Sequence, residues 1–197
     1  MAAIAALAIL PACSSGSDLA APAVPVGTGG VEAPAAVYVA IGGVETLNGS
    51  RDDIQDNWPQ IVFAEKLPAG TVYVNLATDS ATARSALDDQ LPRAQALHPT
   101  VATVWVESAD VRSGVATAVY RDQLTQIVQG LQTAGARRVL LLTPSRTQAD
   151  LAGGLADSVT EVARQTGAVV VDLGDTSDRQ DDPGQRRIAD AVMAAMG

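Results

Sequence analysis

The chain has very few of the residues on which catalytic and metal-binding sites commonly depend. Its 197 residues include one cysteine, Cys13, and one histidine, His98. A single cysteine excludes an intramolecular disulfide and a cysteine-rich zinc site, and a single histidine excludes a metal site with several histidine ligands. There is also no Gly-x-x-x-x-Gly-Lys-Ser/Thr loop for binding a nucleotide phosphate. We therefore expect no metal and no cofactor.

Positive charge and aromatic side chains are scarce as well. Lys66 is the only lysine, and the formal net charge is -9. Nucleic-acid binding needs Lys/Arg patches that face phosphates, so this charge balance argues against a nucleic-acid partner. Aromatic residues make up 3% of the chain while hydrophobic residues make up 47%. A core of mainly Ala, Val, Leu and Ile is therefore expected, and the length suits one domain plus a tail.

The N-terminal segment is apolar and ends at the lone cysteine. Met1 to Ala12 is rich in small residues and too short to span a bilayer. Leu10-Pro11-Ala12-Cys13 resembles the bacterial lipobox, in which cleavage precedes a cysteine that receives diacylglycerol. A signal peptide begins with positive charge, and none precedes Cys13, so we expect the true start to lie upstream or the recorded start to be truncated. The alternative is a frayed N-terminus with a chance cysteine.

The segment after Cys13 has the composition of a tether. Residues 14–35 are rich in Ser, Gly, Pro and Ala and cannot bury enough apolar surface to become ordered. We predict a signal peptide and lipobox at 1–13, a disordered tether at 14–35, and a folded domain at 36–197. The protein is then expected to be exported and held by a lipid at Cys13, on the outer face of the bacterial cytoplasmic membrane or in the cell envelope.

Strand-like and helix-like segments alternate from Ala36 onward. The strand-like runs are β-branched and nearly continuous, which is typical of strands covered on both faces; they span 37–41, 71–76, 101–106, 139–143 and 169–173. Helical patterns occupy about 57–66, 82–97, 115–134, 150–166 and 183–196. This alternation predicts a three-layer α/β/α sandwich around a doubly wound, five-stranded parallel sheet of the flavodoxin-like type.

Ligands of such sheets bind beyond the carboxyl ends of the strands. The loops expected there carry acids and arginines: Glu45, Asp79, Glu107, Asp110, Asp175, Asp178, Asp181, Asp182, Arg51, Arg112, Arg146 and Arg179. Paired carboxylates could hold a divalent cation or act as acid and base; we favour a solvated polar rim. His98 precedes the third strand, roughly 20 Å from this edge. We expect it to be a helix C-terminal or loop residue.

Sequence blocks at these strand ends resemble those of SGNH (GDSL-type) hydrolases. Tyr38 to Thr46 resembles the first block, Ala-Leu-Gly-Asp-Ser-x-Thr, and Asn57-Trp58-Pro59 resembles the start of the following helix in secreted members. The second block, Asn-Leu-Ala-x-Ser-Gly-Ala-Thr, matches Asn75 to Thr82, and the third, Gly-x-Asn-Asp, matches the region up to Asp110. Gly184 to Asp190 resembles the helix after the catalytic Asp-x-x-His. The resemblance covers about Ala36 to Met196 and implies the family's fold.

The same resemblance implies that the family's catalytic groups are missing. The family's Asp and nucleophilic Ser fall on Gly43 and Val44, its oxyanion Gly on Ser80, the third-block Gly and Asn on Glu107 and Ala109, and the C-terminal Asp and His on Thr176 and Arg179, with Asp175 one residue away. Only Asp110 is kept. We expect the loop residues Val44, Ser80, Ala109 and Arg179 to meet in one depression. Arg179 is expected either to pair with Glu107, Asp110 or Asp175, or to lie in solvent.

Three functions remain open. We favour a non-catalytic SGNH-hydrolase-like lipoprotein, a pseudoenzyme that binds a cell-envelope protein, a glycan or a lipid. The second is a carboxylate-based glycan hydrolase that uses residues such as Glu107 and Asp110. The third is an SGNH-type esterase or acyl hydrolase with displaced catalytic residues, in which Ser80 or Ser108 works with a carboxylate. A carboxylate is a poor base for serine near neutral pH.

Overall fold

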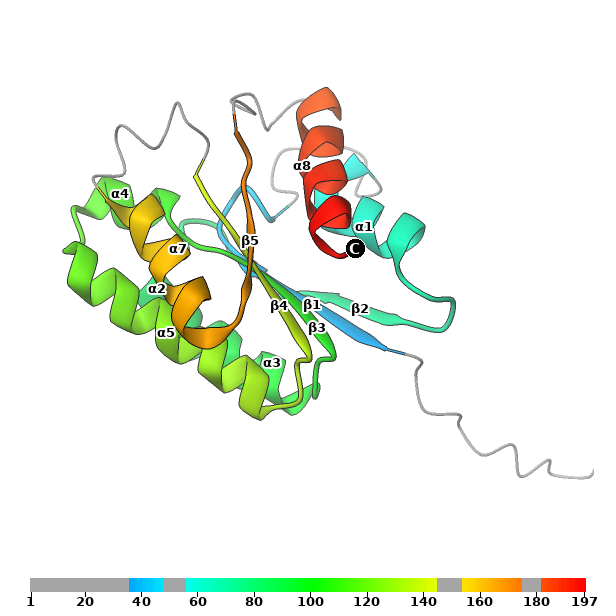
Figure 1. Ribbon diagram of the computed structural model, residues 1–197, viewed down its shortest axis with the longest axis horizontal. Helices are drawn as coiled ribbons and strands as arrows, with labels where there is room; N and C mark the ends of the chain where they lie inside the picture. The colour runs from blue at the N-terminus through cyan, green and yellow to red at the C-terminus, as the bar shows by residue number, and fades with distance from the viewer. Residues whose placement is uncertain (1–35, 48–55, 145–153, 175–181) are drawn as a thin grey trace, which may run out of the picture. The chain divides into compact units, whose positions relative to one another are not determined.

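A computed structural model describes residues 36–47, 56–144, 154–174 and 182–197. Its core is a five-stranded parallel sheet in the order β2-β1-β3-β4-β5 (Figure 1). The strands are β1 (Val37–Gly42), β2 (Val72–Asn75), β3 (Val101–Trp105), β4 (Arg138–Leu142) and β5 (Val169–Val171). The chain starts at β1, moves outward to β2 and then returns past β1 to β3. This order reverses between β1 and β3, where doubly wound sheets bind their ligands.

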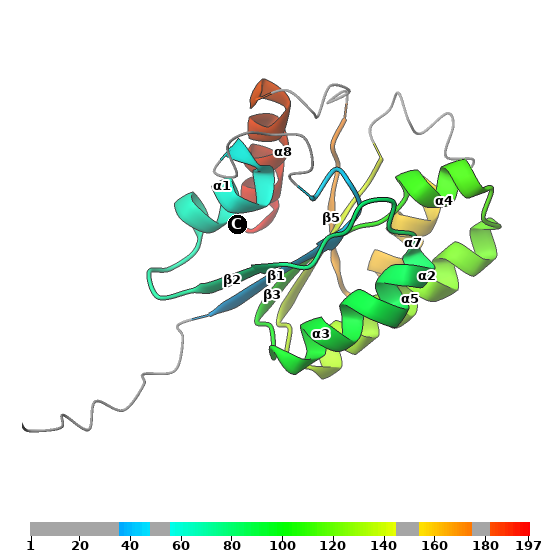
Figure 2. The same ribbon diagram turned by 180° about the vertical axis from the view of Figure 1, so that it is seen from behind.

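Helices cover both faces of the sheet, as Figures 1 and 2 show from opposite sides. One face carries α1 (Trp58–Lys66) and α8 (Asp182–Ala195). The other carries α2 (Ala83–Ser85), a π-helical turn η2 (Ala86–Gln90), α3 (Leu91–Ala96), α4 (Ser108–Ser113), α5 (Thr117–Thr133) and α7 (Leu155–Thr166). The predicted three-layer fold with a doubly wound parallel sheet is confirmed.

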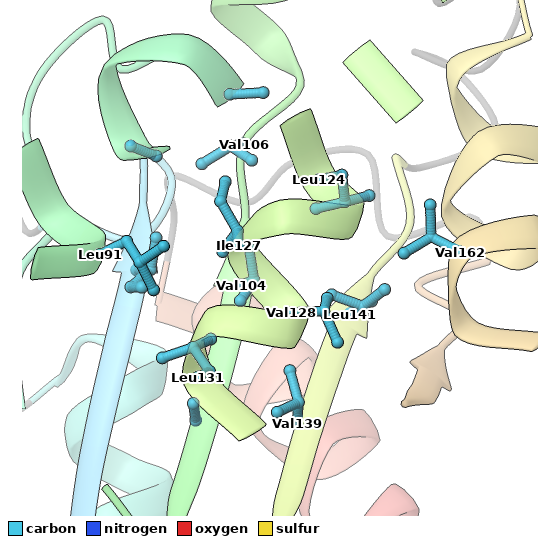
Figure 3. Packing of buried hydrophobic residues seen from close by; sticks show 14 of the residues in the cluster. Leu91, Val104, Val106, Leu124, Ile127, Val128, Leu131, Val139, Leu141 and Val162 are labelled. Carbon is cyan, nitrogen blue, oxygen red and sulfur yellow. The ribbon is translucent and has the colours of Figure 1, made fainter. Parts of the chain in front are cut away.

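Alternating side chains of each strand serve two separate cores. In β1, Val39 and Ile41 pack toward α5, whereas Tyr38 and Ala40 pack toward α1 and α8. This alternation follows from the period of two along a strand. Figure 3 shows the first core, where side chains of β3 and β4 such as Val104 and Leu141 meet those of α5 and α7. The inner strands β1, β3 and β4 are thus buried from both sides, whereas Val72 of the edge strand β2 is exposed.

The few aromatic residues are divided unevenly between these cores. All except Tyr120 lie on the α1/α8 face; they are Tyr38, Trp58, Phe63, Tyr73 and Trp105. The rings of Tyr38 and Tyr73 stack at 5.2 Å, and those of Trp58 and Trp105 lie 6.3 Å apart. The other face is closed by aliphatic side chains, as the composition predicted.

Most element boundaries differ from the sequence-based expectation by one or two residues, and three differences are larger. Residues 108–113, expected to be loop, form the short helix α4. The helix expected over 82–97 is interrupted by η2, and β5 ends at Val171 instead of residue 173. Gly167 caps α7 with a left-handed φ of 76°, a conformation that glycine adopts without steric cost. The predicted signal peptide, Cys13 and the tether lie outside the described residues. Within those residues, no helix has the length and apolar character needed to cross a membrane.

Candidate functional site

The loop that follows β1 packs tightly against the end of β3. A Cβ added to Gly42 would lie 2.3 Å from the Thr46 hydroxyl oxygen and 2.9 Å from the Trp105 carbonyl oxygen, so only glycine fits there. The Thr46 carbonyl accepts hydrogen bonds from the Asn57 amide at 3.0 Å and the Asn75 amide at 2.8 Å. The Asn57-Trp58 pair and Asn75 of the family-like blocks therefore hold this loop.

Two further side chains fix the same loop. The Trp58 indole N–H donates to the Glu45 carbonyl at 3.0 Å. Gln90, in η2, accepts from the Gly42 amide at 3.0 Å and donates to the Gly42 carbonyl at 3.1 Å and to the Thr78 hydroxyl at 3.2 Å. The π-helical turn brings this buried side chain to the end of β1. Sequence reasoning missed Gln90, because a glutamine within a helical pattern carries no signal of such a role.

Three loops meet in a small depression at the carboxyl edge of the sheet. They follow β1, β2 and β3, and the residues lining the depression are Gly43, Val44, Glu45, Ser80, Ala81, Glu107, Ser108, Ala109 and Arg112. The prediction that Val44, Ser80 and Ala109 come together is confirmed. The volume is about 170 Å³, including open solvent, below the roughly 300 Å³ at which small-molecule pockets begin. As formed by the described residues, the depression is too small to enclose a substrate of ordinary size.

Ser80 has a backbone conformation that suits glycine. Its φ is 57°, in the left-handed region where a Cβ is unfavourable. The sequence resemblance places a glycine at this position. The left-handed backbone at Ser80 agrees with that placement, although the side chain is a serine. The exposed Ser80 hydroxyl has one long hydrogen bond, at 3.4 Å, to the Asp79 carboxylate.

Glu107 stands where the family-like third block has glycine, and its carboxyl group is buried. The side chain is 2% exposed. One carboxyl oxygen accepts from the Trp105 indole N–H, and the other has no partner among the described residues. Burial, with the nearby Glu45 and Asp110 carboxylates adding to it, raises the pKa of Glu107 well above its usual range. Burial therefore favours the protonated form of this carboxyl group, which lines the depression.

Asp110, where the sequence resemblance keeps an aspartate, links two helices. It is 0% exposed, and one carboxyl oxygen accepts from the Ala83 backbone N–H at 2.8 Å, at the start of α2. Its other oxygen is also without a partner in the part of the chain that the structure describes. Burial raises the pKa of Asp110 to about 6, despite the hydrogen bond from Ala83. Its contacts give it a structural task that needs no substrate.

Glu45 and Ser108 form the most direct polar contact in the depression. The Ser108 hydroxyl donates to the Glu45 carboxylate across the gap between the β1 loop and the first turn of α4. Glu45 is 9% exposed. The other carboxylate oxygen of Glu45 would lie 3.3 Å from a Cβ added to Gly43, so the carboxylate lies close to the Gly43 backbone. Val44, next to it, offers no group that could react.

The paired-carboxylate alternative meets a geometric obstacle. Glycoside hydrolysis needs two carboxyl groups that flank the scissile bond. Glu107 and Asp110 are buried and already hold Trp105 and Ala83, so neither can reach a sugar in this arrangement. Within the described ranges, no three His, Cys, Asp or Glu side chains are arranged to hold a metal ion.

His98 lies at the opposite edge, as predicted. It follows α3, donates its backbone N–H to the Gln95 carbonyl at 3.1 Å and has a left-handed φ of 48°. The side chain is exposed, three residues before β3 begins. The only imidazole of the chain is therefore at the amino end of the sheet, away from the depression.

Several predicted site residues lie outside the described residues. They are Arg51, Arg146, Asp175, Thr176, Asp178, Arg179 and Asp181. Asp182 begins α8. The expected ion pair of Arg179 with Glu107, Asp110 or Asp175 consequently stays a prediction.

A second and larger hollow lies beside α7. It is lined by Thr143, Pro144, Ala156, Asp157, Thr160, Val170 and Asp172, with a volume of about 580 Å³ including open solvent. Asp172 already accepts from the Gly174 backbone N–H at 2.9 Å, and Thr143 donates to the Val171 carbonyl at 3.3 Å. Asp172 and Thr143 in this hollow are thus already hydrogen-bonded to backbone groups of neighbouring residues.

Comparison with known proteins identifies the family of this arrangement. The profile of the GDSL-like lipase/acylhydrolase family matches residues 34–192. No curated protein shows significant sequence similarity. Among solved structures, LAE5, an alpha/beta hydrolase enzyme from the metagenome of Lake Arreo in Spain, is 20% identical with a TM-score of 0.69, over 84% of this chain and 96% of its own.

Two esterases superpose equally well. Axe2, an acetylxylan esterase from Geobacillus stearothermophilus, is 15% identical with a TM-score of 0.70, over 83% of this chain and 95% of its own. The psychrotrophic esterase EstA from a Pseudoalteromonas species is 15% identical with a TM-score of 0.65, over 82% and 96%. At such low identity these likenesses establish a shared fold.

Proposed function

The chain belongs to the GDSL-like lipase/acylhydrolase family, and we propose that it is a non-catalytic member, a cell-envelope lipoprotein that binds a ligand or an envelope partner. The observation that carries this proposal is Val44 in the depression, at the position that aligns with the family's nucleophile. A valine side chain has no lone pair to attack a carbonyl carbon. The family's ester chemistry therefore lacks its first step.

The other groups that the family's ester hydrolysis needs are missing as well. Ala109, aligned with the oxyanion Asn, has no side-chain donor, and loss of one such donor costs about 10²–10³ in rate. A hydrolase without its triad retains roughly 10³–10⁴ over water only through its oxyanion hole and substrate binding. The only histidine, His98, lies at the other edge of the sheet. The family's nucleophile, its histidine base and its side-chain oxyanion donor are therefore all missing from the depression.

The loops around the depression are held in place, as a binding site requires. Asn57, Asn75, Trp58 and Gln90 fix the backbone around the depression by hydrogen bonds. Such pinning keeps the loops in place without any catalytic group to orient. The lipobox-like Leu10-Pro11-Ala12-Cys13 supports attachment to a membrane through a lipid at Cys13.

One specific contact favours a second candidate, an acyl hydrolase with a displaced nucleophile. Ser108 donates to the Glu45 carboxylate and lines the depression. In such an enzyme the Ser108 oxygen would attack the acyl carbon while its proton passes to Glu45. The weakness of a carboxylate as a base toward serine near neutral pH places this candidate second.

Ester turnover separates the two candidates. The purified protein is incubated with short acyl esters, and product formation is compared with that of a heat-denatured sample. We expect no difference. Turnover that Ser108→Ala abolishes and Ser80→Ala leaves intact would establish the displaced-serine enzyme instead. Chemical cross-linking in whole cells, followed by mass spectrometry, then tests for the envelope partner; recovery of no cross-linked protein, glycan or lipid would contradict the binding role.

Lipid attachment has its own test. The gene, with any upstream start, is expressed in a bacterium that processes lipoproteins, and the membrane fraction is compared with that of Cys13→Ala. We expect wild-type protein in the membrane fraction, a thioether-linked diacylglycerol on the mature N-terminal cysteine, and release of the variant. Membrane association unchanged by Cys13→Ala would contradict the anchor.

A further inference from the structure

The amino edge of the sheet carries exposed positive charge, although the chain as a whole is acidic. Arg137 and Arg138 lead into β4, and both side chains are exposed. His98, just before β3, and Arg93, in α3, are exposed as well. We call these four residues the basic edge. Because the formal net charge of the chain is -9, a surface with three arginines at one end of the sheet runs against the overall charge balance.

Hydrogen bonds around Thr100 hold the segments of the basic edge together. The Thr100 carbonyl, two residues after His98, accepts from the backbone N–H groups of Arg137 at 2.9 Å and Arg138 at 3.3 Å. The Thr100 hydroxyl accepts from the Val37 amide at 3.0 Å, at the start of β1. The C-terminal end of α3 lies beside the starts of β3 and β4 (Figure 2). These contacts place the basic edge at one end of the sheet, next to the start of β1.

The acids on the long helices that extend toward this edge are already paired. In the C-terminal halves of α1, α5, α7 and α8, the acids are Glu65, Glu161 and Asp190. Arg186 donates to Glu65 at 2.7 and 2.9 Å and to Asp190 at 3.1 Å. Arg164 donates to Glu161 at 2.7 Å. These carboxylates are therefore neutralised by other arginines and do not cancel the charge of the basic edge.

The chain enters the domain at the same edge. The Ala36 carbonyl, directly before β1, accepts from the Val72 amide at 2.9 Å, so the entry point is fixed to the sheet. Cys13, the proposed site of lipid attachment, precedes it by the Ser-, Gly-, Pro- and Ala-rich residues 14–35. A flexible segment of that length has a root-mean-square reach of roughly 25 Å. Such a tether keeps the domain near the membrane but does not set its orientation, so the charges on its surface decide which side faces the lipid.

The opposite edge has charge of the other sign. Asp79, Asp157 and Asp172 are exposed toward the carboxyl ends of the strands, where Arg112 is the described cation that lines the depression. Since β3 has five residues, the two edges lie roughly 17 Å apart. This distance is about twice the Debye length at physiological ionic strength. A charged surface in contact with one edge is consequently screened from the other.

We propose that the basic edge docks on anionic lipid headgroups and orients the tethered domain, with its amino edge on the membrane and its depression facing away. The proposal rests on the lipoprotein part of the proposed function. Arginine suits this partner because its planar guanidinium pairs with phosphate oxygens through two hydrogen bonds. Interaction with a helix dipole accounts for Arg93, in the last turn of α3. It does not account for Arg137 and Arg138, which lie in no helix.

The lone thiol and the lone lysine of the chain make the orientation measurable. The full chain, produced without lipidation, is coupled through Cys13 to a maleimide lipid in vesicles of phosphatidylcholine, alone or mixed with phosphatidylglycerol. Because Lys66 is the only native lysine, Arg138→Lys and Arg112→Lys each add one amine, at the amino and the carboxyl edge, without changing the charge. Peptide mass spectrometry records the rate at which a water-soluble reagent acylates the added amine.

We expect the amine at position 138 to be acylated at least about fivefold more slowly on the anionic vesicles, since each basic residue near such a surface favours binding by roughly that factor. The amine at position 112 should be acylated at the same rate on both kinds of vesicle. Added salt should remove the protection at position 138, because it screens the attraction.

Matched charge variants assign the protection to the basic edge. In the Arg138→Lys protein, Arg93→Gln with Arg137→Gln removes two charges from this edge and should reduce the ratio of docked to free domain roughly 25-fold. Arg84→Gln with Arg187→Gln removes the same charge from exposed positions in α2 and in the first half of α8. This control pair should leave the protection unchanged.

Four results would overturn the docking surface. They are equal acylation at position 138 on both kinds of vesicle, equal protection at positions 138 and 112, and protection that survives loss of the two basic-edge charges. The fourth is protection that follows the density of protein on the vesicle and not the lipid charge, which would mean that a second copy covers the edge. Because the maleimide lipid supplies the anchor chemically, failure of docking is distinguishable from failure of lipid attachment at Cys13.

Discussion

The two edges of the sheet satisfy their buried polar groups to different degrees. At the amino edge, the Thr100 hydroxyl accepts from the Val37 amide at 3.0 Å and donates to the Val37 carbonyl at 3.2 Å, joining β1 to the segment before β3. At the carboxyl edge, Thr46, Glu107 and Asp110 each keep a buried oxygen without a partner among the described residues. Buried polar groups are usually paired; besides these three, the described residues have one more such oxygen, on Gln123 of α5.

That difference fits the history that the family implies. The buried polar groups of the amino edge have only to join strands. The carboxyl edge carries the loops that form the depression, which Val44, Glu107 and Ala109 help to line. The frame around them is intact, because Asn57, Asn75 and Gln90 still hold the loops. The comparison teaches that the backbone of the carboxyl edge is firmly held even though some of its buried side chains are not fully paired.

Gln90→Ala should have the largest effect, because it removes the scaffold of the carboxyl edge. Its side chain makes three hydrogen bonds, two of them with the backbone of Gly42. Truncation leaves these buried groups unpaired and opens a cavity, so we expect a loss of about 2–4 kcal/mol in the free energy of unfolding. Urea denaturation measures this loss. A change below about 0.5 kcal/mol would mean that solvent replaces the glutamine at no cost.

Asp110→Asn should have a smaller effect of opposite sign at neutral pH. The raised pKa of about 6 means that the folded state loses stability as pH rises through that value, since the unfolded chain ionises nearer 3.8. Asparagine does not ionise, so it removes this loss of stability, and its side-chain oxygen can still accept the hydrogen bond from Ala83. We expect a gain of about 1–2 kcal/mol at neutral pH that disappears near pH 4, a range that allows for solvent screening of the group.

Melting curves at the two pH values check the sign for Asp110→Asn. At neutral pH, a gain of this size corresponds to an increase of roughly 2–8 °C for a chain of this length. A variant that is less stable than wild type at both pH values would show that Asp110 is charged and stabilising. The carboxyl edge would then satisfy its buried groups as well as the amino edge does.

Thr100→Val tests the well-paired edge. The substitution keeps the volume but removes both hydrogen bonds to Val37. We expect a loss of about 1 kcal/mol that does not depend on pH, because no titrating group is involved. If the loss in melting temperature varied strongly with pH, the amino edge would share the property assigned to the carboxyl edge.

Ser80→Gly should have the smallest effect, a gain of up to about 1 kcal/mol. Glycine relieves the left-handed backbone at φ 57°, although the unfolded chain gains freedom at the same time. Differential scanning calorimetry against Ser85→Gly, which removes a helix-capping hydroxyl and should destabilise, gives the matched control. A loss for Ser80→Gly would mean that its hydroxyl contributes more than its backbone strain.

The fold was accessible from the sequence because its signals are periodic. Five β-branched runs and the helical patterns between them predicted the sheet and both helical layers, and the positions of the strand ends predicted that Val44, Ser80 and Ala109 meet. The helix α4 was missed because its six residues are too few to show a periodic pattern. These predictions rest on local patterns, which a single sequence displays.

The details of the site depend on contacts between distant segments, and no local pattern encodes them. The Glu45–Ser108 contact joins residues 63 positions apart, and that of Gln90 with Gly42 spans 48. A glutamate after a strand looks the same in sequence whether it points to solvent or, like Glu107, beneath the loop. The expectation of a solvated polar rim was therefore wrong for Glu45, Glu107 and Asp110, which are buried because the loops close over them.

The absence of an activated nucleophile is tested most directly by labelling with a fluorophosphonate, which phosphonylates reactive serine hydroxyls. The purified protein is incubated with the reagent beside an active serine esterase, and intact masses are recorded. We predict an unchanged mass for this protein while the esterase gains one phosphonyl group. A single adduct that disappears in Ser108→Ala and persists in Ser80→Ala would contradict the account, because it would show that the Ser108–Glu45 pair is an active site.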